Sequence, residues 1–254
     1  MRRLRALARL GHAVGHGLHG LAIVLFRFPS LDVGARRERI RWWAKKMLAV
    51  LGIAFEREGE PVRHAALVVV NHVSWLDIMA VHAVVPEARF VSKADVKAWP
   101  LVSRLVEAGG TLYLERERKR DALRVVHAIA AALAGGEVVA IFPEGTTSTG
   151  HGLLPFHANL LQAAIATATP VQPVALRFSE AANAVSEAVE FVGATSLMRS
   201  LWQTSCGEGV RARLTFLPPR ASAGADRREL AALLRADIGA ALGIDPDAAP
   251  ATLA

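Results

Sequence analysis

Short apolar runs alternate with helix-like amphipathic segments from residue 66 to residue 217, and this alternation restricts the fold more than any other feature. Such a pattern is typical of an α/β sheet with helices on its faces. The predicted strands lie near residues 66–70, 89–92, 111–115, 137–142, 171–177, 188–192 and 210–217. The predicted helices lie near residues 74–85, 98–108, 118–134, 155–168 and 227–242.

The first 60 residues differ from the rest of the chain in charge. The chain has 30 Lys/Arg and 23 Asp/Glu; this segment holds 12 and 5 of them, whereas residues 61–254 hold 18 of each. We therefore divide the chain into an N-terminal segment over 1–60, one domain over 61–245 and a disordered tail over 246–254. The balanced charge of the domain argues against nucleic-acid binding, which is kept only as a remote alternative.

Two basic amphipathic helices are predicted in the N-terminal segment, over residues 2–28 and 36–51. In the first, apolar residues recur every three or four positions until a proline ends the pattern. The second contains Trp42 and Trp43, which suit a membrane interface. The uncharged stretch 10–26 is shorter than the roughly 20 residues that span a bilayer. We expect both helices to lie on an anionic membrane surface; packing on the core with solvated charges is the alternative.

The chain has a single cysteine, Cys206, which excludes an intramolecular disulfide and fits a reducing compartment. It lies in a segment predicted to be a loop, so we do not expect it to be a nucleophile. His12, His16 and His19 recur at helical spacing. We interpret them as a polar stripe on an interfacial helix rather than as metal ligands, and we expect no metal ion and no bound cofactor.

The stretch VVVNHVSWLD, residues 68–77, places polar residues directly after a buried strand. Ser74 and Asp77 have the spacing of a capping box, but helix initiation does not explain Asn71 and His72. The same spacing allows the Asp77 carboxylate to accept the Nδ1–H of His72, which leaves Nε2 free to remove a proton from a hydroxyl. The chain has no G-x-S-x-G motif, so we expect a substrate hydroxyl to be activated; a serine hydrolase is the less favoured alternative.

The segment Asn71 to Asp77 resembles the N-H-x-S-x-x-D motif of the glycerolipid acyltransferases, the family that includes 1-acylglycerol-3-phosphate acyltransferase. Three further blocks match that family in order and spacing, at residues 110–116, 142–146 and 171–174. The resemblance covers residues 66 to about 178 and implies a mixed, largely parallel sheet flanked by helices. It also implies that His72 is the general base and that Asp77 orients it. The implied donor is an acyl thioester of coenzyme A or acyl carrier protein.

The resemblance also implies contacts to the substrate. Arg116 resembles the arginine that holds the acceptor's phosphate, Glu144 resembles the glutamate that contacts its hydroxyls, and Lys93 is a lesser candidate for an anionic group. The other candidate substrate-binding residues are Asn71, Ser74, Gly145 and Thr146.

Thr147 occupies the position at which relatives acting on lysophosphatidate usually have arginine. This variant resembles enzymes that acylate lyso-ornithine lipid, an aminolipid without phosphate. We expect the acceptor to be 1-acylglycerol-3-phosphate, giving phosphatidic acid, with lyso-ornithine lipid as the alternative. The expected location is the cytoplasmic face of the inner membrane, with peripheral or monotopic attachment.

Overall fold

The computed structural model describes residues 2–93, 100–114 and 119–245. The strands are β1 (Ala54–Glu58), β2 (Ala66–Val70), β3 (Arg89–Lys93), β4 (Leu112–Leu114), β5 (Val138–Ile141), β6 (Val171–Ser179) and β7 (Arg211–Phe216). The α-helices are α1 (Arg2–Ala22), α2 (Val33–Val50), α3 (Leu76–His82), α4 (Pro100–Ala108), α5 (Lys119–Ala134), α6 (Gln162–Thr167), α7 (Leu197–Cys206) and α8 (Arg227–Leu242).

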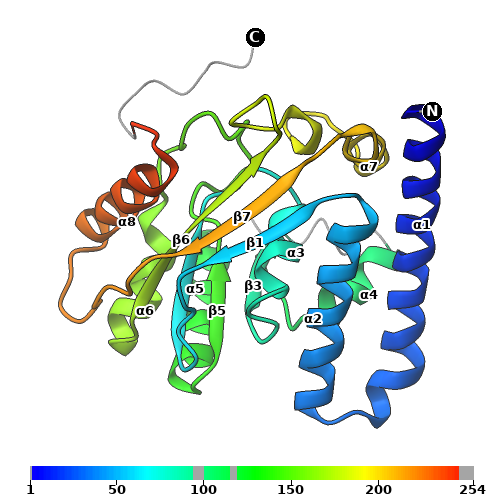
Figure 1. The fold of residues 1–254 in the computed structure, drawn as a ribbon. Coiled ribbons are helices and arrows are strands. Elements are labelled where there is room, and N and C mark those ends of the chain that lie inside the picture. The colour runs from blue at the N-terminus through cyan, green and yellow to red at the C-terminus, as the bar shows by residue number, and fades with distance from the viewer. Residues whose placement is uncertain (1, 94–99, 115–118, 246–254) are drawn as a thin grey trace.

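The described strands form one sheet of seven, in the order β1-β7-β6-β2-β5-β3-β4 (Figure 1). Neighbouring strands are parallel except for the antiparallel pair β6 and β7. This arrangement confirms the expected mixed, largely parallel sheet. Ligand sites in such sheets lie beyond the carboxyl ends of the parallel strands, so the segment that follows β2 is well placed for function.

The central strand β2 shows why the sheet is covered on both faces. All five of its residues are buried, and successive side chains point to opposite faces. Val68 and Val70 belong to the apolar cluster that includes side chains of α2 and α3. Leu67 and Val69 belong to a second cluster with side chains of α5, α6 and α8. The continuous apolar run in the sequence therefore reflects burial from both sides.

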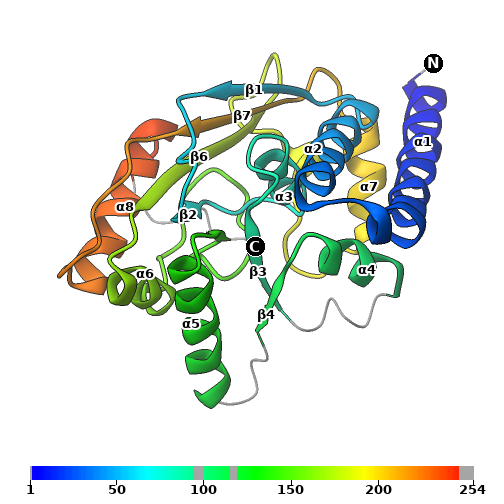
Figure 2. The same ribbon diagram turned by 90° about the horizontal axis from the view of Figure 1, so that it is seen from below.

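Helices α1 and α2 form an antiparallel hairpin at one end of the molecule, opposite α8 (Figures 1 and 2). Trp43 donates its Nε1–H to the carbonyl of His16 at 3.0 Å, and His16 Nε2 lies 3.0 Å from the carbonyl of Trp43. Gly20 permits this approach, because a Cβ there would lie 2.3 Å from the Trp43 ring. No helix among the described residues has the length and hydropathy required to cross a bilayer.

The side of α1 that faces the protein carries small residues. Ala6, Ala13 and Gly20 are buried there, and Arg9 donates hydrogen bonds to the carbonyls of Ser205 and Gly207 at the carboxyl end of α7. Leu4, Leu7 and Leu18 lie on the opposite side and are exposed. Helix α1 thus turns small side chains toward the protein and presents large apolar ones at its outer side.

Two predictions at the carboxyl half of the chain are wrong. Residues 188–192 do not form a strand; Glu187–Val189 is a short 3-10 helix, and Phe191 hydrogen-bonds to the loop after β2 instead of to a sheet neighbour. Cys206 is not in a loop but at the end of α7, a helix that Ser196 caps by accepting from the Arg199 N–H.

Two further elements differ from the expectation. The predicted helix over 155–168 is only a 3-10 turn, Ala158–Leu161, followed by the short α6. The edge strand β1 was not predicted, because its charged residues Glu56, Arg57 and Glu58 hide the strand pattern. The tail 246–254 lies outside the described residues.

Candidate active site

His72 and Asp77 form a hydrogen-bonded pair at the carboxyl end of β2. The distance from His72 Nδ1 to Asp77 Oδ2 is 2.7 Å, which confirms the contact predicted from their spacing. Asp77 lies in the first turn of α3 and is fully buried, whereas the His72 side chain is 18% exposed. Because Nδ1 donates to the carboxylate, Nε2 carries the lone pair that can accept a proton.

The Asp77 carboxylate also organises the loop that carries His72. Its Oδ2 accepts the N–H of Val73 at 2.7 Å and the N–H of Ser74 at 3.0 Å. The second of these is half of the predicted capping box. The other half is absent, since Trp75 rather than Ser74 precedes the helix as its N-cap, and the buried Ser74 hydroxyl has no hydrogen-bond partner among the described residues.

Asn71 connects the end of β2 to the neighbouring strand β6. Its side-chain amide donates to the carbonyl of Leu176 at 2.9 Å, and its side-chain oxygen accepts the Leu176 N–H at 2.8 Å. Both polar groups of this buried side chain are therefore used within the protein. The sequence predicted a substrate contact for Asn71; its contacts support a structural role that fixes the start of the His72 loop.

The segment Phe142 to Ser148, which follows β5, surrounds His72. The ring of Phe142 stacks on the His72 ring, with centroids 4.0 Å apart and planes at 11°. Glu144 accepts the His72 N–H through Oε1 at 2.6 Å, and through Oε2 it accepts the Leu154 N–H at 2.9 Å. Ser148 donates to the His72 carbonyl from its N–H at 2.8 Å and from its hydroxyl at 3.2 Å.

The electrostatics of this segment centre on Glu144. Burial raises the pKa of this carboxyl to about 7, and the charge of Asp77 acts in the same direction. The hydrogen bonds from the His72 and Leu154 amides and the charge of Arg235 oppose the increase in pKa. Glu144 is therefore a carboxyl group that ionises near neutral pH beside His72 and Asp77.

The three residues between Glu144 and Ser148 have other contacts or are exposed. Gly145 adopts φ +69°, a conformation that favours glycine, and its N–H donates to the Phe142 carbonyl at 3.1 Å. Thr146 is exposed, and the hydroxyl of Thr147 donates to the carbonyl of Phe191. The substrate contacts predicted for Gly145 and Thr146 stay predictions.

Lys93 and Arg116 are the two basic residues predicted to bind an anionic group of the acceptor. Lys93 is the last residue of β3, two strands from β2 in the sheet, so its backbone lies on the same carboxyl edge as the dyad. Arg116 lies outside the described residues. Their predicted contacts with an anionic acceptor group stay predictions.

A second set of hydrogen bonds holds the His72 loop in place and could not be predicted from the sequence. Phe191 donates its N–H to the Val73 carbonyl at 3.3 Å, and the Trp75 indole N–H donates to the Ser200 hydroxyl at 3.1 Å. These bonds join the His72 loop to α7 and the segment before it. No local pattern predicts them, because each pair is separated by more than a hundred residues.

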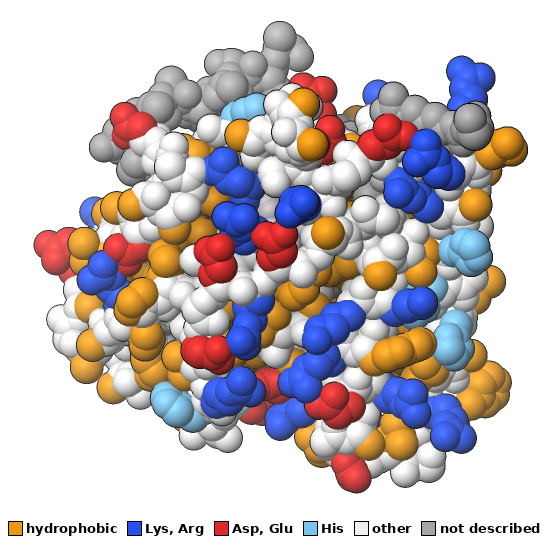
Figure 3. Space-filling model, in the orientation of Figure 1, with side chains coloured by type: hydrophobic (Ala, Val, Ile, Leu, Met, Phe, Trp, Pro, Cys, Tyr) orange, Lys and Arg blue, Asp and Glu red, His pale blue; other side chains and the backbone are white. Residues whose placement is uncertain are grey.

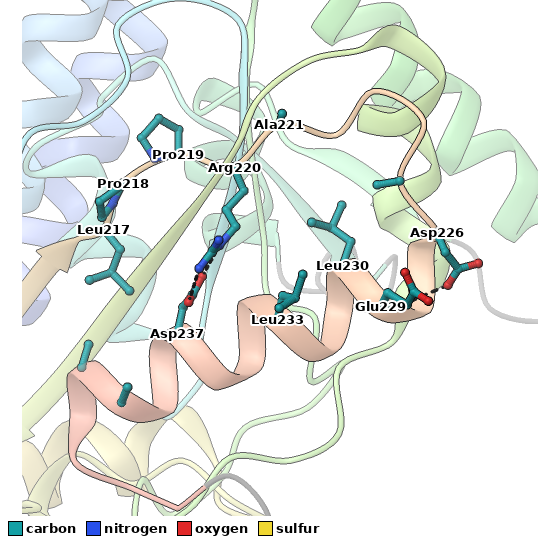
Figure 4. Close-up of a pocket in the computed structure, with 13 residues that line it drawn as sticks. Leu217, Pro218, Pro219, Arg220, Ala221, Asp226, Glu229, Leu230, Leu233 and Asp237 are labelled. Atoms are coloured by element: carbon teal, nitrogen blue, oxygen red, sulfur yellow. Dashed lines mark hydrogen bonds and ion pairs between the residues drawn. The ribbon is translucent and has the colours of Figure 1, made fainter.

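A pocket of about 690 Å³ lies elsewhere, between α8 and residues 217–221 (Figure 4). Arg220 and Asp237 form an ion pair across it, with both N–O distances 2.6 Å. Arg220 pairs with Val171 at the start of β6, whereas the dyad follows the end of the parallel strand β2. The pocket therefore lies near the amino-terminal ends of the parallel strands β2 and β6, whereas His72 and Asp77 lie beyond the carboxyl end of β2. It takes no part in the proposed chemistry.

Comparison with known proteins decides the family. The family model described as Acyltransferase matches residues 53–177, a range that contains the dyad and the Glu144 loop. The lyso-ornithine lipid O-acyltransferase of Pseudomonas aeruginosa is 37% identical over 238 residues, which cover 91% of each chain. This chain belongs to the acyltransferase family. It is an enzyme of that class, as the sequence motifs predicted.

Two further comparisons extend this result. The 1-acyl-sn-glycerol-3-phosphate acyltransferase of Neisseria gonorrhoeae is 38% identical over 184 residues, covering 69% of this chain and 68% of that one. The crystal structure of the 1-acyl-sn-glycerophosphate acyltransferase PlsC from Thermotoga maritima matches with a TM-score of 0.73 and 21% identity, covering 96% of this chain and 97% of that one. At this identity, the structural match supports the fold alone.

Proposed function

We propose that this acyltransferase moves a fatty acyl group from an acyl thioester to the free hydroxyl of a lysolipid. The 2.7 Å hydrogen bond between His72 and Asp77 carries the proposal, because it orients the imidazole with Nε2 available as a base. Nε2 takes the proton of the acceptor hydroxyl while the acceptor oxygen attacks the thioester carbonyl carbon. The C–S bond then breaks, and the imidazolium returns the proton to the leaving thiolate. The thioester, of coenzyme A or acyl carrier protein, is the co-substrate.

The acceptor that we favour is lyso-ornithine lipid. The P. aeruginosa relative that matches over 91% of the chain carries that activity in its name. In addition, Thr147 has no charge to offer a phosphate, and its hydroxyl is already donated to the Phe191 carbonyl. Lysophosphatidate is the second candidate, supported by the N. gonorrhoeae relative and by the cations Lys93 and Arg116 predicted to bind an anion.

A labelled acyl thioester offered with a panel of lysolipids tests both parts of the proposal. The panel contains lyso-ornithine lipid and lysophosphatidate, and mass spectrometry identifies the acylated product. The His72→Ala variant should lose about 10³-fold in kcat, the scale of general-base catalysis. His127→Ala, which removes an exposed histidine from α5, is the matched control and should retain full activity. Unchanged turnover in a folded His72→Ala protein would refute the proposed mechanism.

We further propose that α1 and α2 hold the enzyme on the cytoplasmic face of the inner membrane, as a peripheral or monotopic protein. The large apolar residues Leu4, Leu7, Val14 and Leu18 are exposed along the outer side of α1. Figure 3 shows hydrophobic and histidine side chains along the edge where α1 lies. On α2, Arg37, Lys45 and Lys46 are exposed and can approach anionic headgroups. An apolar stripe beside basic residues matches the chemistry of a charged lipid surface.

A further inference from the structure

We propose that Glu144 is a positioning residue that fixes the main chain of His72, rather than a ligand of the acceptor's hydroxyls. This inference rests on the proposed role of His72 as general base. One carboxylate oxygen of Glu144 accepts the His72 N–H at 2.6 Å, and the other accepts the Leu154 N–H at 2.9 Å. The residue is 2% exposed, so little carboxylate surface is available to a substrate.

The chemistry of the contact explains why a carboxylate stands at this position. An ionised carboxylate has two acceptor oxygens and no donor, so it can accept backbone N–H groups from two separate segments. Glutamine has the same shape, but its NH₂ group would face one of these N–H donors. Aspartate is one methylene shorter. Glu144 therefore joins the His72 loop to the segment at Leu154 in a way that neither related side chain reproduces.

The other contacts of the loop restrict His72 from further directions. Ser148 binds the His72 carbonyl, Phe142 covers one face of the imidazole and Asp77 binds Nδ1. Together with Glu144, these contacts fix the N–H, the carbonyl and the ring of a single residue. Since general-base catalysis depends on placing Nε2 within hydrogen-bond reach of the acceptor hydroxyl, loss of one contact should lower the rate of the chemical step.

The ionisation of Glu144 provides a readout that a merely structural role would not change. Its pKa is raised to about 7 by burial and by Asp77 of α3, and it is lowered by its two backbone hydrogen bonds and by Arg235 of α8. As the pH falls below 7, the carboxyl gains a proton, and one of its oxygens then becomes a donor. Protonation of Glu144 should therefore lower the activity of the wild-type enzyme as the pH falls through 7.

The test compares the wild-type enzyme with Glu144→Gln by steady-state kinetics across pH. In the variant, kcat should fall about 100-fold, the scale of a misplaced catalytic group, while the KM for the lysolipid changes less than about threefold. The fall of log kcat/KM as the pH is lowered through 7 should be less steep in the variant than in the wild type, because the variant lacks the Glu144 carboxyl. Glu137→Gln, which removes a half-exposed carboxylate at the start of β5, is the matched control and should match the wild type.

The possible results separate this inference from the proposed function. A raised acceptor KM with unchanged kcat in Glu144→Gln would overturn the inference and favour contact with the acceptor. A wild-type kcat/KM that stays constant as the pH is lowered through 7 would also overturn it, and that measurement needs no variant to fold. Activity in His72→Ala would instead refute the proposed function. Loss of activity in His72→Ala, with full activity and an unchanged pH profile in Glu144→Gln, would leave the function standing and refute the role of Glu144.

Discussion

Replacing Leu4, Leu7 and Leu18 with glutamine should release the protein from lipid vesicles without unfolding it. These side chains are 72%, 55% and 55% exposed on the outer side of α1. Burying a fully exposed leucine stabilises by about 2 kcal/mol, so inserting the exposed parts of all three contributes about 4 kcal/mol. Glutamine is chosen because its helix propensity is close to that of leucine.

This free energy sets the size of the expected effect on binding. Because about 1.4 kcal/mol corresponds to a factor of ten, full insertion predicts a loss of about a thousandfold in the partition coefficient. An interfacial helix buries its apolar face only as far as the headgroup and acyl boundary, so about half of the free energy is a reasonable lower bound. That bound corresponds to about a thirtyfold loss.

Co-sedimentation with vesicles that contain anionic phospholipid measures the change. The titration is repeated at about 1 M salt, which screens the basic side chains and leaves the apolar contribution. Leu123→Gln and Leu233→Gln are matched controls, since these leucines are 60% and 50% exposed on α5 and α8, away from α1 (Figures 1 and 2). A loss below about threefold in the triple variant, or an equal loss in the controls, would refute the assignment of α1 to the membrane.

Two predictions concern stability. Burial lowers the pKa of His82 to about 4, so below pH 6.5 the unfolded chain binds a proton that the folded protein does not, and stability falls as the pH falls. Relative to His82→Gln, the wild type should lose about 2 kcal/mol between pH 7 and pH 5 in urea unfolding, and parallel curves for the two proteins would contradict this. Asn71→Ala leaves the buried Leu176 N–H and carbonyl without their partner and should cost about 2–4 kcal/mol at pH 7; a loss under about 1 kcal/mol would show that the bridge between β2 and β6 is dispensable.

Elements whose burial is uniform along their length could be predicted from the sequence. The predicted strands at 66–70, 137–142 and 171–177 correspond to β2, β5 and β6, each a run of mostly buried apolar residues. Strand β1 could not be found in this way, because it lies at the edge of the sheet and carries charges that pair with arginines of β7. The apolar residues near Val189 suggest a strand, although Val189 belongs to a short 3-10 helix and is buried in the apolar cluster on one face of the sheet.

The same distinction applies to the site. The contact between His72 and Asp77 depends on five residues at a strand end and a helix start, so local geometry predicts it. The bonds of Asn71 to Leu176 and of Glu144 to His72 join positions 105 and 72 residues apart. Composition and spacing carry no information about such contacts until the strands are placed side by side. The segment that contains Glu144 can therefore be singled out from the sequence, but the two N–H groups that its carboxylate accepts cannot.

The exposed leucines on the outer side of α1 have an evolutionary consequence. These leucines contribute nothing to the protein interior, where α1 docks through the buried residues Ala6, Ala13 and Gly20 and through the hydrogen bonds of Arg9 and His16. Substitutions along the outer stripe can therefore accumulate without disturbing the catalytic loop. With α1 on the membrane as proposed, adaptation to a different lipid composition and refinement of the chemistry can proceed on separate sets of residues within one short chain.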